Sequence, residues 1–431
     1  MDLARAGYNL LGLGLVGLGA PAGWIASRLS GRWGWFWPRM GLYRGVELAP
    51  GEARVWLQAV SVGEVEVAWA VARRLVEAGV EVVMTSSTQR GLERARALAG
   101  AQALVLPMPV DVPWAVAAAV RAIRPTAYGS VETELWPNLS ARLGAAGVVQ
   151  VLVNGRISPR SFPRYSRLKA LVGPVLGRLR SLGMISAADA QRVVALGAAP
   201  GRVEVVGNAK YALLADRLAR AEPSRLAGRL GVQAEAVVVA GSVRTGEIVP
   251  VLEAFKLLLQ GGQEALLVVV PRHEGRSWRW VEAARARGLG VVRWSELAAL
   301  GRRPREAKVV VVDRMGLLLE LYGLADAAFV GASLVELGGQ NPMEPAAWGV
   351  RVCFGPDMSD FADEARRLLQ AGAAEVVRDA RELADAWARA IAMGPAPPEA
   401  ARQLVAASRR AAARYAAMVL RAVVEGMKRA G

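Results

Sequence analysis

Short apolar runs alternate with helical patterns along most of this chain, and this alternation restricts the fold more than any other feature. After each run, apolar residues recur at three- and four-residue spacing, as in residues 65–79 and 89–100. Near-continuous apolar strands separated by helices indicate parallel sheets covered on both faces. In the first half, the predicted strands lie at 53–61, 80–87, 103–109, 126–132, 148–156, 181–187 and 203–208.

The same alternation begins again in the second half of the chain. A chain of 431 residues is also too long for a single hydrophobic core. We therefore expect two doubly wound α/β domains, at 41–212 and 213–396, followed by a packing or crossover helix at 397–431. The predicted strands of the second domain lie at 236–242, 265–272, 290–294, 308–313, 327–333 and 350–356.

The N-terminus is of a different kind, because residues 8–26 carry no charge and are long enough to cross a bilayer. Tryptophans at and after its end resemble an interfacial belt, and the excess of Arg after the segment places the rest of the protein in the cytoplasm. Glycines and Pro21 lower its hydrophobicity, so it could instead lie in the membrane interface. We expect residues 1–40 to be a membrane anchor, spanning or interfacial. The flanking residues are Arg5, Trp24, Arg28, Arg32, Trp33, Trp35, Trp37, Arg39 and Arg44.

The charge balance favours an anionic partner. The chain has 54 Lys and Arg against 38 Asp and Glu, a net charge of +16. The basic residues are spread along the chain without a nucleic-acid-binding motif, which argues against nucleic acid. The single cysteine, Cys353, lies in an apolar run and is expected to be a buried strand residue. The single histidine, His273, excludes a metal site built from several histidines.

Polar residues follow the predicted strands in both halves. In doubly wound sheets the ligand lies beyond the carboxyl ends of the strands, so these residues predict a cleft with one wall from each domain. In the first half they are Glu64, 85–91, 131–138, 154–160 and 207–210. In the second half they are 241–247, 271–276, 313–316 and 338–345.

The second half is expected to bind a nucleotide. Small residues at 241–242 and 338–339 would let backbone amides approach an anion, and helices starting near Glu247 and Pro342 would point their positive ends at it. Glu344 in the first turn complements the helix dipole or accepts hydrogen bonds from a ribose. The chain contains neither a Gly-x-Gly-x-x-Gly nor a Walker sequence, which argues against a dinucleotide or ATP enzyme.

Glu64 follows the first strand and has two interpretations. Ser61 and Glu64 have the S-x-x-E spacing of a capping box, in which each side chain satisfies a free amide at a helix start. Alternatively, a carboxylate at a strand end that faces the ligand can act as a general base.

Several motifs occur together in the order found in one enzyme family. They are "SVGE", "ETELWPN", "NGRISPRSFPRY", "GNAK", "PRHEGR", "DRMGLLLELYGLAD" and "GGQNPMEPAAWG". From about residue 20 to 375 the chain resembles 3-deoxy-D-manno-octulosonic acid (Kdo) transferases. This resemblance implies a GT-B fold with two Rossmann-like domains, the first for the acceptor and the second for CMP-Kdo. It also implies metal-independent, cofactor-free, inverting transfer of Kdo to a lipid A precursor at the cytoplasmic face of the bacterial inner membrane.

The resemblance also assigns roles to residues. Glu64 matches the family's general base, Glu132 an acid that stabilises the transition state, and Lys210 its cationic partner. The positions that match donor contacts are Pro271, Arg272, Met315, Gly316, Leu317, Asn341, Pro342, Met343 and Glu344.

The sequence departs from the family at three positions where histidine is usual: Gln58, Arg244 and Gln340. Each can donate a hydrogen bond, but none is an acid or base near neutral pH. The donor or acceptor could therefore be a different acidic sugar or lipid. Two other functions stay open: another two-domain sugar-nucleotide enzyme such as an epimerase, or an inactive protein that binds a nucleotide sugar at the membrane.

Overall fold

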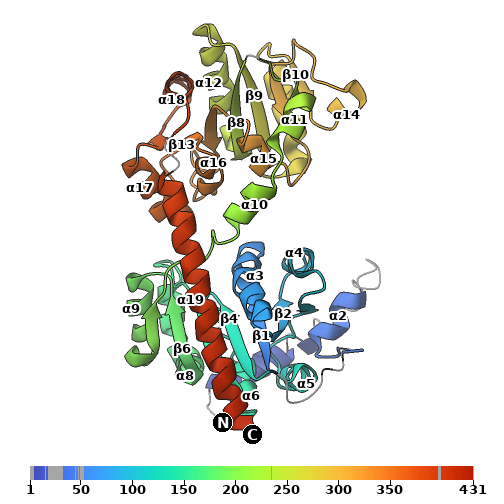
Figure 1. The fold of residues 1–431 in the computed structure, drawn as a ribbon, viewed down its shortest axis with the longest axis vertical. Helices are drawn as coiled ribbons and strands as arrows, with labels where there is room; N and C mark the ends of the chain where they lie inside the picture. The colour runs from blue at the N-terminus through green and yellow to red at the C-terminus, as the bar shows by residue number, and fades with distance from the viewer. Residues whose placement is uncertain are drawn as a thin grey trace. The chain divides into compact units, whose positions relative to one another are not determined.

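The computed structural model of the protein describes residues 4–14, 16–17, 33–43, 45–46, 48, 53–233, 235–396 and 399–430. The chain forms two compact units, one from Met1–Leu213 with Ala406–Gly431 and one from Leu214–Val405 (Figure 1). Much of the predicted membrane segment, residues 15 and 18–26, lies outside the described residues. Among the described helices, none is both long and apolar enough to cross a bilayer.

Unit 1 is built on a seven-stranded parallel sheet with the strand order β3-β2-β1-β4-β5-β6-β7. Strand β1 lies inside the sheet and pairs with β2 and with β4, and Leu57 lies opposite Met84 on one side and Gly129 on the other. The strands are β1 (Arg54–Ala59), β2 (Glu81–Ser86), β3 (Leu104–Pro107), β4 (Ala127–Val131), β5 (Val149–Gly155), β6 (Leu179–Met184) and β7 (Val203–Val205).

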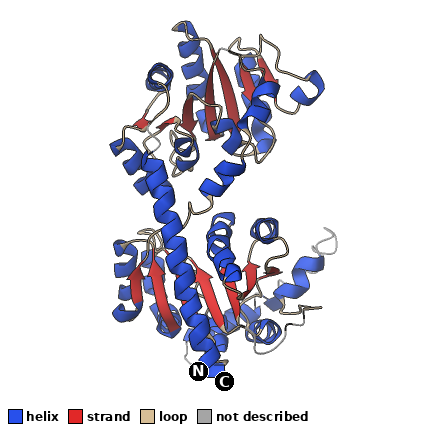
Figure 2. Ribbon diagram, in the orientation of Figure 1, coloured by secondary structure: helices blue, strands red, loops and turns tan. Residues whose placement is uncertain are grey.

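Helices cover both faces of this sheet (Figure 2). Alternate residues of β1 enter different cores: Val55 and Leu57 pack with α3 and α19, whereas Trp56 packs with α5 and α6. The helices are α2 (Trp33–Arg39), α3 (Val62–Glu77), α4 (Gln89–Ala99), α5 (Pro113–Ile123), α6 (Pro137–Ala145), α7 (Phe162–Arg167), α8 (Lys169–Arg178), α9 (Ala187–Ala195) and α19 (Glu399–Ala430).

The C-terminal helix α19 returns to unit 1, far from its neighbours in sequence. It packs its buried alanines and Tyr415 into the same core as α3 (Figure 1). The Tyr415 hydroxyl donates to the carbonyl of Gly207 at 2.8 Å. The end of the chain therefore supports the loop after β7, which carries Lys210.

Unit 2 repeats the plan, with the strand order β10-β11-β9-β8-β12-β13-β14, all parallel. Its strands are β8 (Ala236–Val243), β9 (Ala265–Pro271), β10 (Val291–Arg293), β11 (Val309–Val311), β12 (Ala327–Val330), β13 (Arg351–Phe354) and β14 (Ala374–Val376). Its helices are α10 (Leu214–Arg220), α11 (Pro223–Leu230), α12 (Ile248–Gln260), α13 (Ser277–Arg285), α14 (Leu297–Leu300), α15 (Leu318–Tyr322), α16 (Met343–Ala347), α17 (Ala362–Gln370) and α18 (Ala380–Met393).

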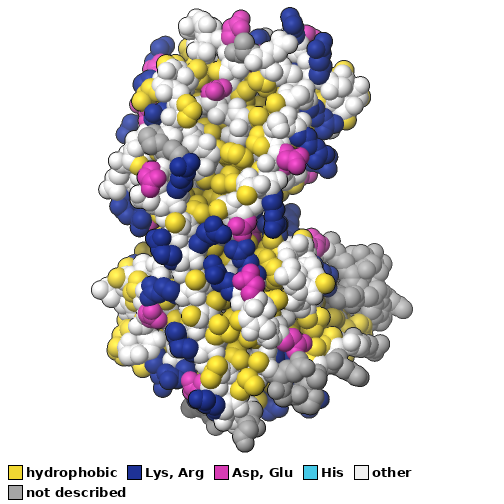
Figure 3. All heavy atoms as spheres, in the orientation of Figure 1, with side chains coloured by type: hydrophobic (Ala, Val, Ile, Leu, Met, Phe, Trp, Pro, Cys, Tyr) yellow, Lys and Arg dark blue, Asp and Glu magenta, His cyan; other side chains and the backbone are white. Residues whose placement is uncertain are grey.

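These two sheets confirm the α/β prediction and its doubly wound form. Cys353 is a buried residue of β13, as its apolar surroundings predicted. Lys and Arg side chains are scattered over both units on the face drawn in Figure 3, with Asp and Glu among them.

Candidate active site

Glu64 lies in the first turn of α3, directly after β1. Its carboxylate accepts hydrogen bonds from the amides of Val60 at 2.8 Å and Ser61 at 3.3 Å. The Ser61 hydroxyl in turn accepts from the Glu64 amide at 3.2 Å, so the capping box is complete. The capping interpretation is confirmed. The same bonds hold the carboxylate at the carboxyl edge of the sheet, where the second interpretation also needs it.

Glu132 directly follows β4 in an unusual backbone conformation. Its φ of 58° is left-handed, which costs a residue with a side chain about 1–2 kcal/mol. The conformation is held by the Glu132 amide, which donates to the carbonyl of Val153 at 2.8 Å. Burial and the nearby Glu64 carboxylate raise the pKa of Glu132 to about 7, although Arg156 and Lys210 oppose the shift. The raised pKa makes Glu132 easier to protonate near neutral pH than an ordinary glutamate.

Glu134 is a third carboxylate of this cluster, and the sequence reasoning missed it. Burial raises its pKa to about 7, and the charges of Glu64 and Glu132 contribute to the shift. Three acids this close cannot all be ionised without mutual repulsion. The signal in the sequence was the alternation Glu-Thr-Glu at 132–134 directly after a strand.

Lys210 reaches the cluster from the loop after β7. This loop is fixed by the buried side chain of Asn154, whose Oδ1 accepts from the amide of Ala209 at 2.9 Å. The amide of Lys210 donates to Asn208 Oδ1 at 2.9 Å. The Lys210 ammonium lies 5.8 Å from the Tyr211 ring centroid. Lys210 is one of two cations that lower the pKa of Glu132.

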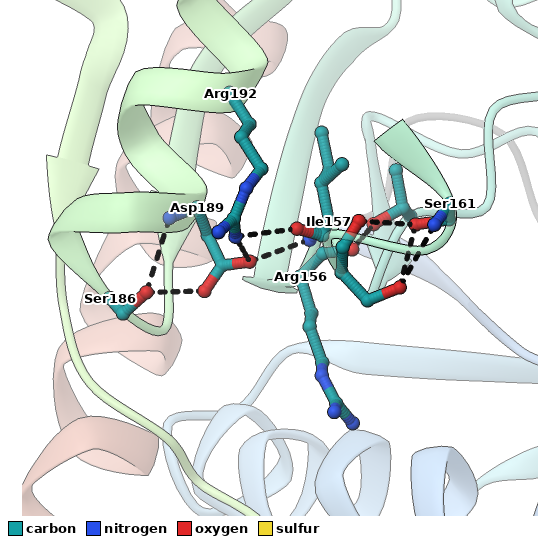
Figure 4. A network of polar contacts seen from close by, with 8 residues as sticks. Arg156, Ile157, Ser161, Ser186, Asp189 and Arg192 are labelled. Carbon is teal, nitrogen blue, oxygen red and sulfur yellow. Dashed lines mark hydrogen bonds and ion pairs between the residues drawn. The ribbon is translucent and has the colours of Figure 1, made fainter. Parts of the chain in front are cut away.

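Arg156, the other cation, lies in the loop after β5 and was not assigned a role from the sequence. The Thr133 hydroxyl donates to the Arg156 carbonyl. Figure 4 shows the polar network around the next residue, Ile157, with the Arg156 side chain pointing away from that network. Unit 1 thus brings Glu64, Glu132 and Lys210 close together, and Glu134 and Arg156 lie near them.

In unit 2, the buried carboxylate of Glu247 holds the loop after β12. It accepts from the amides of Ala332 at 2.8 Å, Ser333 at 3.0 Å and Leu334 at 3.1 Å, and from the amide of Arg244 at 2.8 Å. Backbone amides that could have faced a ligand anion are therefore occupied by the protein's own carboxylate.

The prediction that Gly338 and Gly339 expose amides to an anion is wrong. The Gly338 amide donates to Asp357 Oδ2 at 2.7 Å, and the Gly339 amide donates to the Ala332 carbonyl at 2.8 Å. Both glycines have positive φ, and a Cβ would lie 2.5 Å from Asp360 Oδ2 or 2.4 Å from Met358 Sδ. They are small because the chain approaches them closely and turns there.

The predicted donor residues of unit 2 differ in their accessibility. Met315 is exposed, and Arg272 is exposed with its amide bonded to the Val243 carbonyl at 3.0 Å. Met343 is fully buried, so its side chain packs in the core and cannot contact a donor. Asn341 Oδ1 accepts from the Met343 amide at 3.1 Å. The remaining predicted residues lie in the same loops: Pro271 at the end of β9, Gly316 and Leu317 before α15, and Pro342 before α16.

Glu344 pairs with Arg217 of α10 at 3.0 Å, both within unit 2. A carboxylate held in this way is fixed in place at the start of α16.

The three departures from the family have different surroundings. Gln58 is buried in β1 and bonds to Thr85 and Ser87, so it joins neighbouring strands. Gln340 bonds to the Gly339 carbonyl at 3.0 Å. Arg244 lines a cavity of about 200 Å³ together with Arg276 and the exposed His273.

Arg244 also determines which ring nitrogen of a neutral His273 carries the proton. Arg244 Nη1 and His273 Nε2 are 2.9 Å apart, and a guanidinium can only donate. Nε2 must therefore accept, which places the proton of a neutral imidazole on Nδ1. The Arg244 Nε is buried and makes no hydrogen bond to the described residues.

The chain matches known proteins over most of its length. The family model for 3-deoxy-D-manno-octulosonic-acid transferase matches residues 35–213. The 3-deoxy-D-manno-octulosonic acid transferase of Bordetella pertussis is 32% identical over 409 residues, which cover 91% of this chain and 93% of that protein. The enzyme of the same name from Haemophilus influenzae is 30% identical over 357 residues, covering 82% of this chain and 81% of that protein.

The chain belongs to the Kdo transferase family. The Kdo transferases are glycosyltransferases, so the predicted family and enzyme class are confirmed. A bifunctional glycosyltransferase/methyltransferase of Fusobacterium nucleatum is 33% identical over 322 residues, and this Kdo transferase spans about half the length of that protein.

Solved structures agree on the fold. UDP-GlcNAc 2-epimerase of Neisseria meningitidis has a TM-score of 0.57 at 9% identity, covering 86% of this chain and 99% of that one. A glycosyltransferase of Rickettsia africae has a TM-score of 0.52 at 14% identity, and the match covers 88% of this chain and 98% of that one. At such identities the likeness concerns the fold alone, and it confirms the GT-B type.

Proposed function

We propose that this Kdo transferase moves Kdo, or a related acidic sugar, from its CMP-linked form to a lipid A precursor or similar anionic lipid, with inversion and without a metal. The observation that carries the proposal is the cluster of Glu64, Glu132 and Lys210 at the carboxyl edge of the unit 1 sheet. Three residues matched from the family motifs meet there although they are far apart in sequence.

The proposed reaction is a single displacement. The acceptor hydroxyl oxygen forms a bond to the anomeric carbon of Kdo, and the bond from that carbon to the CMP phosphate oxygen breaks. The electron pair leaves with CMP, and the hydroxyl proton passes to Glu64. The two amides on the Glu64 carboxylate occupy part of its acceptor capacity and orient it, which leaves lone pairs for the proton.

The other charged groups support this displacement. Lys210 and Arg156 are cations close to a site that must hold an anionic sugar and an anionic lipid. Glu132, with its pKa near 7, can donate or accept a proton at little cost at neutral pH. In unit 2, Arg272 and the exposed Met315 lie in the loops proposed for CMP.

We also propose that the protein acts at the cytoplasmic face of the inner membrane, attached by its N-terminus. Residues 4–14 are helical, and Leu10 and Leu11 are 70% and 71% exposed. The same helix is tied to unit 1, because the Tyr8 hydroxyl donates to the buried Asp111 at 3.0 Å. An apolar helix face that is fixed on a folded domain suits an interfacial attachment.

The test is a transfer assay with CMP-Kdo and a lipid A precursor, followed by mass spectrometry of the lipid and by measurement of CMP release. A lipid product heavier by Kdo, formed only with acceptor present, supports the proposal. CMP release or a changed sugar without acceptor would favour an epimerase-like enzyme. CMP binding without any turnover would instead favour an inactive binding protein.

A further inference from the structure

Two buried polar side chains hold the two cations of the site through the backbone of their neighbours. Asn154 holds the amide of Ala209, the residue before Lys210. Asp189 holds the amide of Ile157, the residue after Arg156. Neither Asn154 nor Asp189 has a part in the proposed displacement, so each is a buried polar group whose purpose is otherwise unexplained.

We propose that Asp189 is a positioning residue of the candidate active site, which fixes the loop after β5 so that Arg156 stays as a cation beside Glu132. The inference rests on the proposed function in one respect, namely that Glu132 takes part in transfer. The position of Arg156 itself can be tested without any substrate.

Asp189 is 6% exposed and lies in the first turn of α9. Its Oδ1 accepts from the Ile157 amide at 2.8 Å, and its Oδ2 accepts from the Ser186 hydroxyl. Arg192, one turn along α9, donates to the Ile157 carbonyl at 2.9 Å (Figure 4). Both backbone groups of Ile157 are therefore held by side chains of a single helix, α9.

A second set of contacts joins this loop to the segment that carries Glu132. The Thr133 hydroxyl donates to the Arg156 carbonyl, and the Tyr165 hydroxyl donates to the Thr133 carbonyl at 3.2 Å. Arg156 is thus held at its own carbonyl and at the next residue, Ile157. Its own side chain makes no contact within the Asp189 network in Figure 4 and points away from it. The network fixes the backbone and leaves the guanidinium for the site.

The charges around Glu132 show what this placement achieves. Glu64 of α3 and the nearby Glu134 repel a charged Glu132, whereas Arg156 and Lys210 stabilise it. Burial favours the neutral form. With these charges in place the pKa of Glu132 lies at about 7, so moving Arg156 away must raise it further.

The experiment measures the titration of Glu132 directly, by carbon NMR of protein labelled at the glutamate carboxyl carbons. The Glu132 signal is assigned by its loss in E132Q. We expect R156M to raise the midpoint of Glu132 by about half to one pH unit, since Arg156 is exposed and its charge is partly screened. D189A should raise it in the same direction, because the loop loses its anchor.

D189N is the matched control. An asparagine Oδ1 can still accept from the Ile157 amide, so this variant should keep the midpoint close to that of the parent protein. In the R156M background, D189A should cause no further shift, because its effect passes through Arg156. If D189A does not fold, R192M removes the bond to the Ile157 carbonyl from the same helix and should shift the midpoint upward instead.

An unchanged midpoint in folded D189A or R192M would overturn the inference. So would a D189A shift that persists in full in the R156M background. The transfer rate against pH is a separate measurement. If the Glu132 midpoint moves as expected while the rate profile does not, Asp189 positions Arg156 but Glu132 is not part of the reaction, and only the proposed function fails.

Discussion

The substitution Glu64→Gln separates the two roles of Glu64. Glutamine keeps the shape and one acceptor oxygen, but it cannot take the acceptor's proton. Of the two amide bonds, the one to Val60 at 2.8 Å is the shorter, and glutamine can keep it by placing its oxygen there. The bond to Ser61 at 3.3 Å is then lost, which should cost about 0.5–1 kcal/mol of stability.

The effect on transfer should be far larger. Loss of a general base lowers the rate by about two to four orders of magnitude. The substitution should also change the titration of its neighbours. Without the Glu64 carboxylate, the pKa values of Glu132 and Glu134 should fall below about 7, since Glu64 raises both. A drop in rate that a change of pH cannot restore would therefore belong to the lost base.

The assay is kcat and melting temperature on one preparation. The matched control is Glu66→Gln in the same helix, where the carboxylate pairs with Arg94 at 2.5 Å. That control should cost a similar small stability and leave kcat unchanged. A folded Glu64→Gln enzyme with near-normal kcat would refute the catalytic role and leave Glu64 as a helix cap.

Three further predictions follow from other parts of the chain. Replacing Leu10, Leu11 and Leu13 by Ser should move the protein from the membrane to the soluble fraction, because these exposed leucines would provide the apolar contact; unchanged sedimentation would place the attachment elsewhere. Glu134→Gln should stabilise the protein by about 1–2 kcal/mol at pH 8 but not at pH 4. The reason is that the Glu134 carboxyl has a pKa of about 7 in the folded protein, so the protein loses stability as the pH rises from the pKa of the unfolded chain to 7. Equal melting temperatures of the variant and the parent protein at pH 8 would contradict this. Arg244→His should weaken binding of the CMP-linked acidic sugar by about tenfold relative to CMP, if the cavity binds the sugar's carboxylate. Parallel losses for both ligands would place the phosphate there instead.

The sequence pattern predicted the sheets well because strand burial depends on local composition. The run predicted at 53–61 contains β1, Arg54–Ala59, and the run at 350–356 contains β13, Arg351–Phe354. The return of α19 to unit 1 was not predictable from its own pattern. Its amphipathic surface predicts that one face is buried, but the surface it packs against depends on residues that are distant in sequence. One of these is Gly183, where a Cβ would lie 2.5 Å from the Tyr415 ring.

The candidate site was only partly predictable, for a related reason. Glu64, Glu132 and Lys210 lie in motifs that identify them, whereas Arg156 matters through its distance from a carboxylate in another loop. The prediction for the glycines at 338–339 was wrong because a glycine can be required for two different structural reasons. It can open a backbone to a ligand, or it can admit the protein's own Asp360 and Met358, as it does here.

Capping and catalysis are compatible at Glu64, and the reason is physical. A general base must be held in one position before the proton moves, and a flexible carboxylate would lose that advantage. The amides of Val60 and Ser61 hold it at the start of α3. The capping box that first offered an alternative to catalysis would thus also position the proposed base.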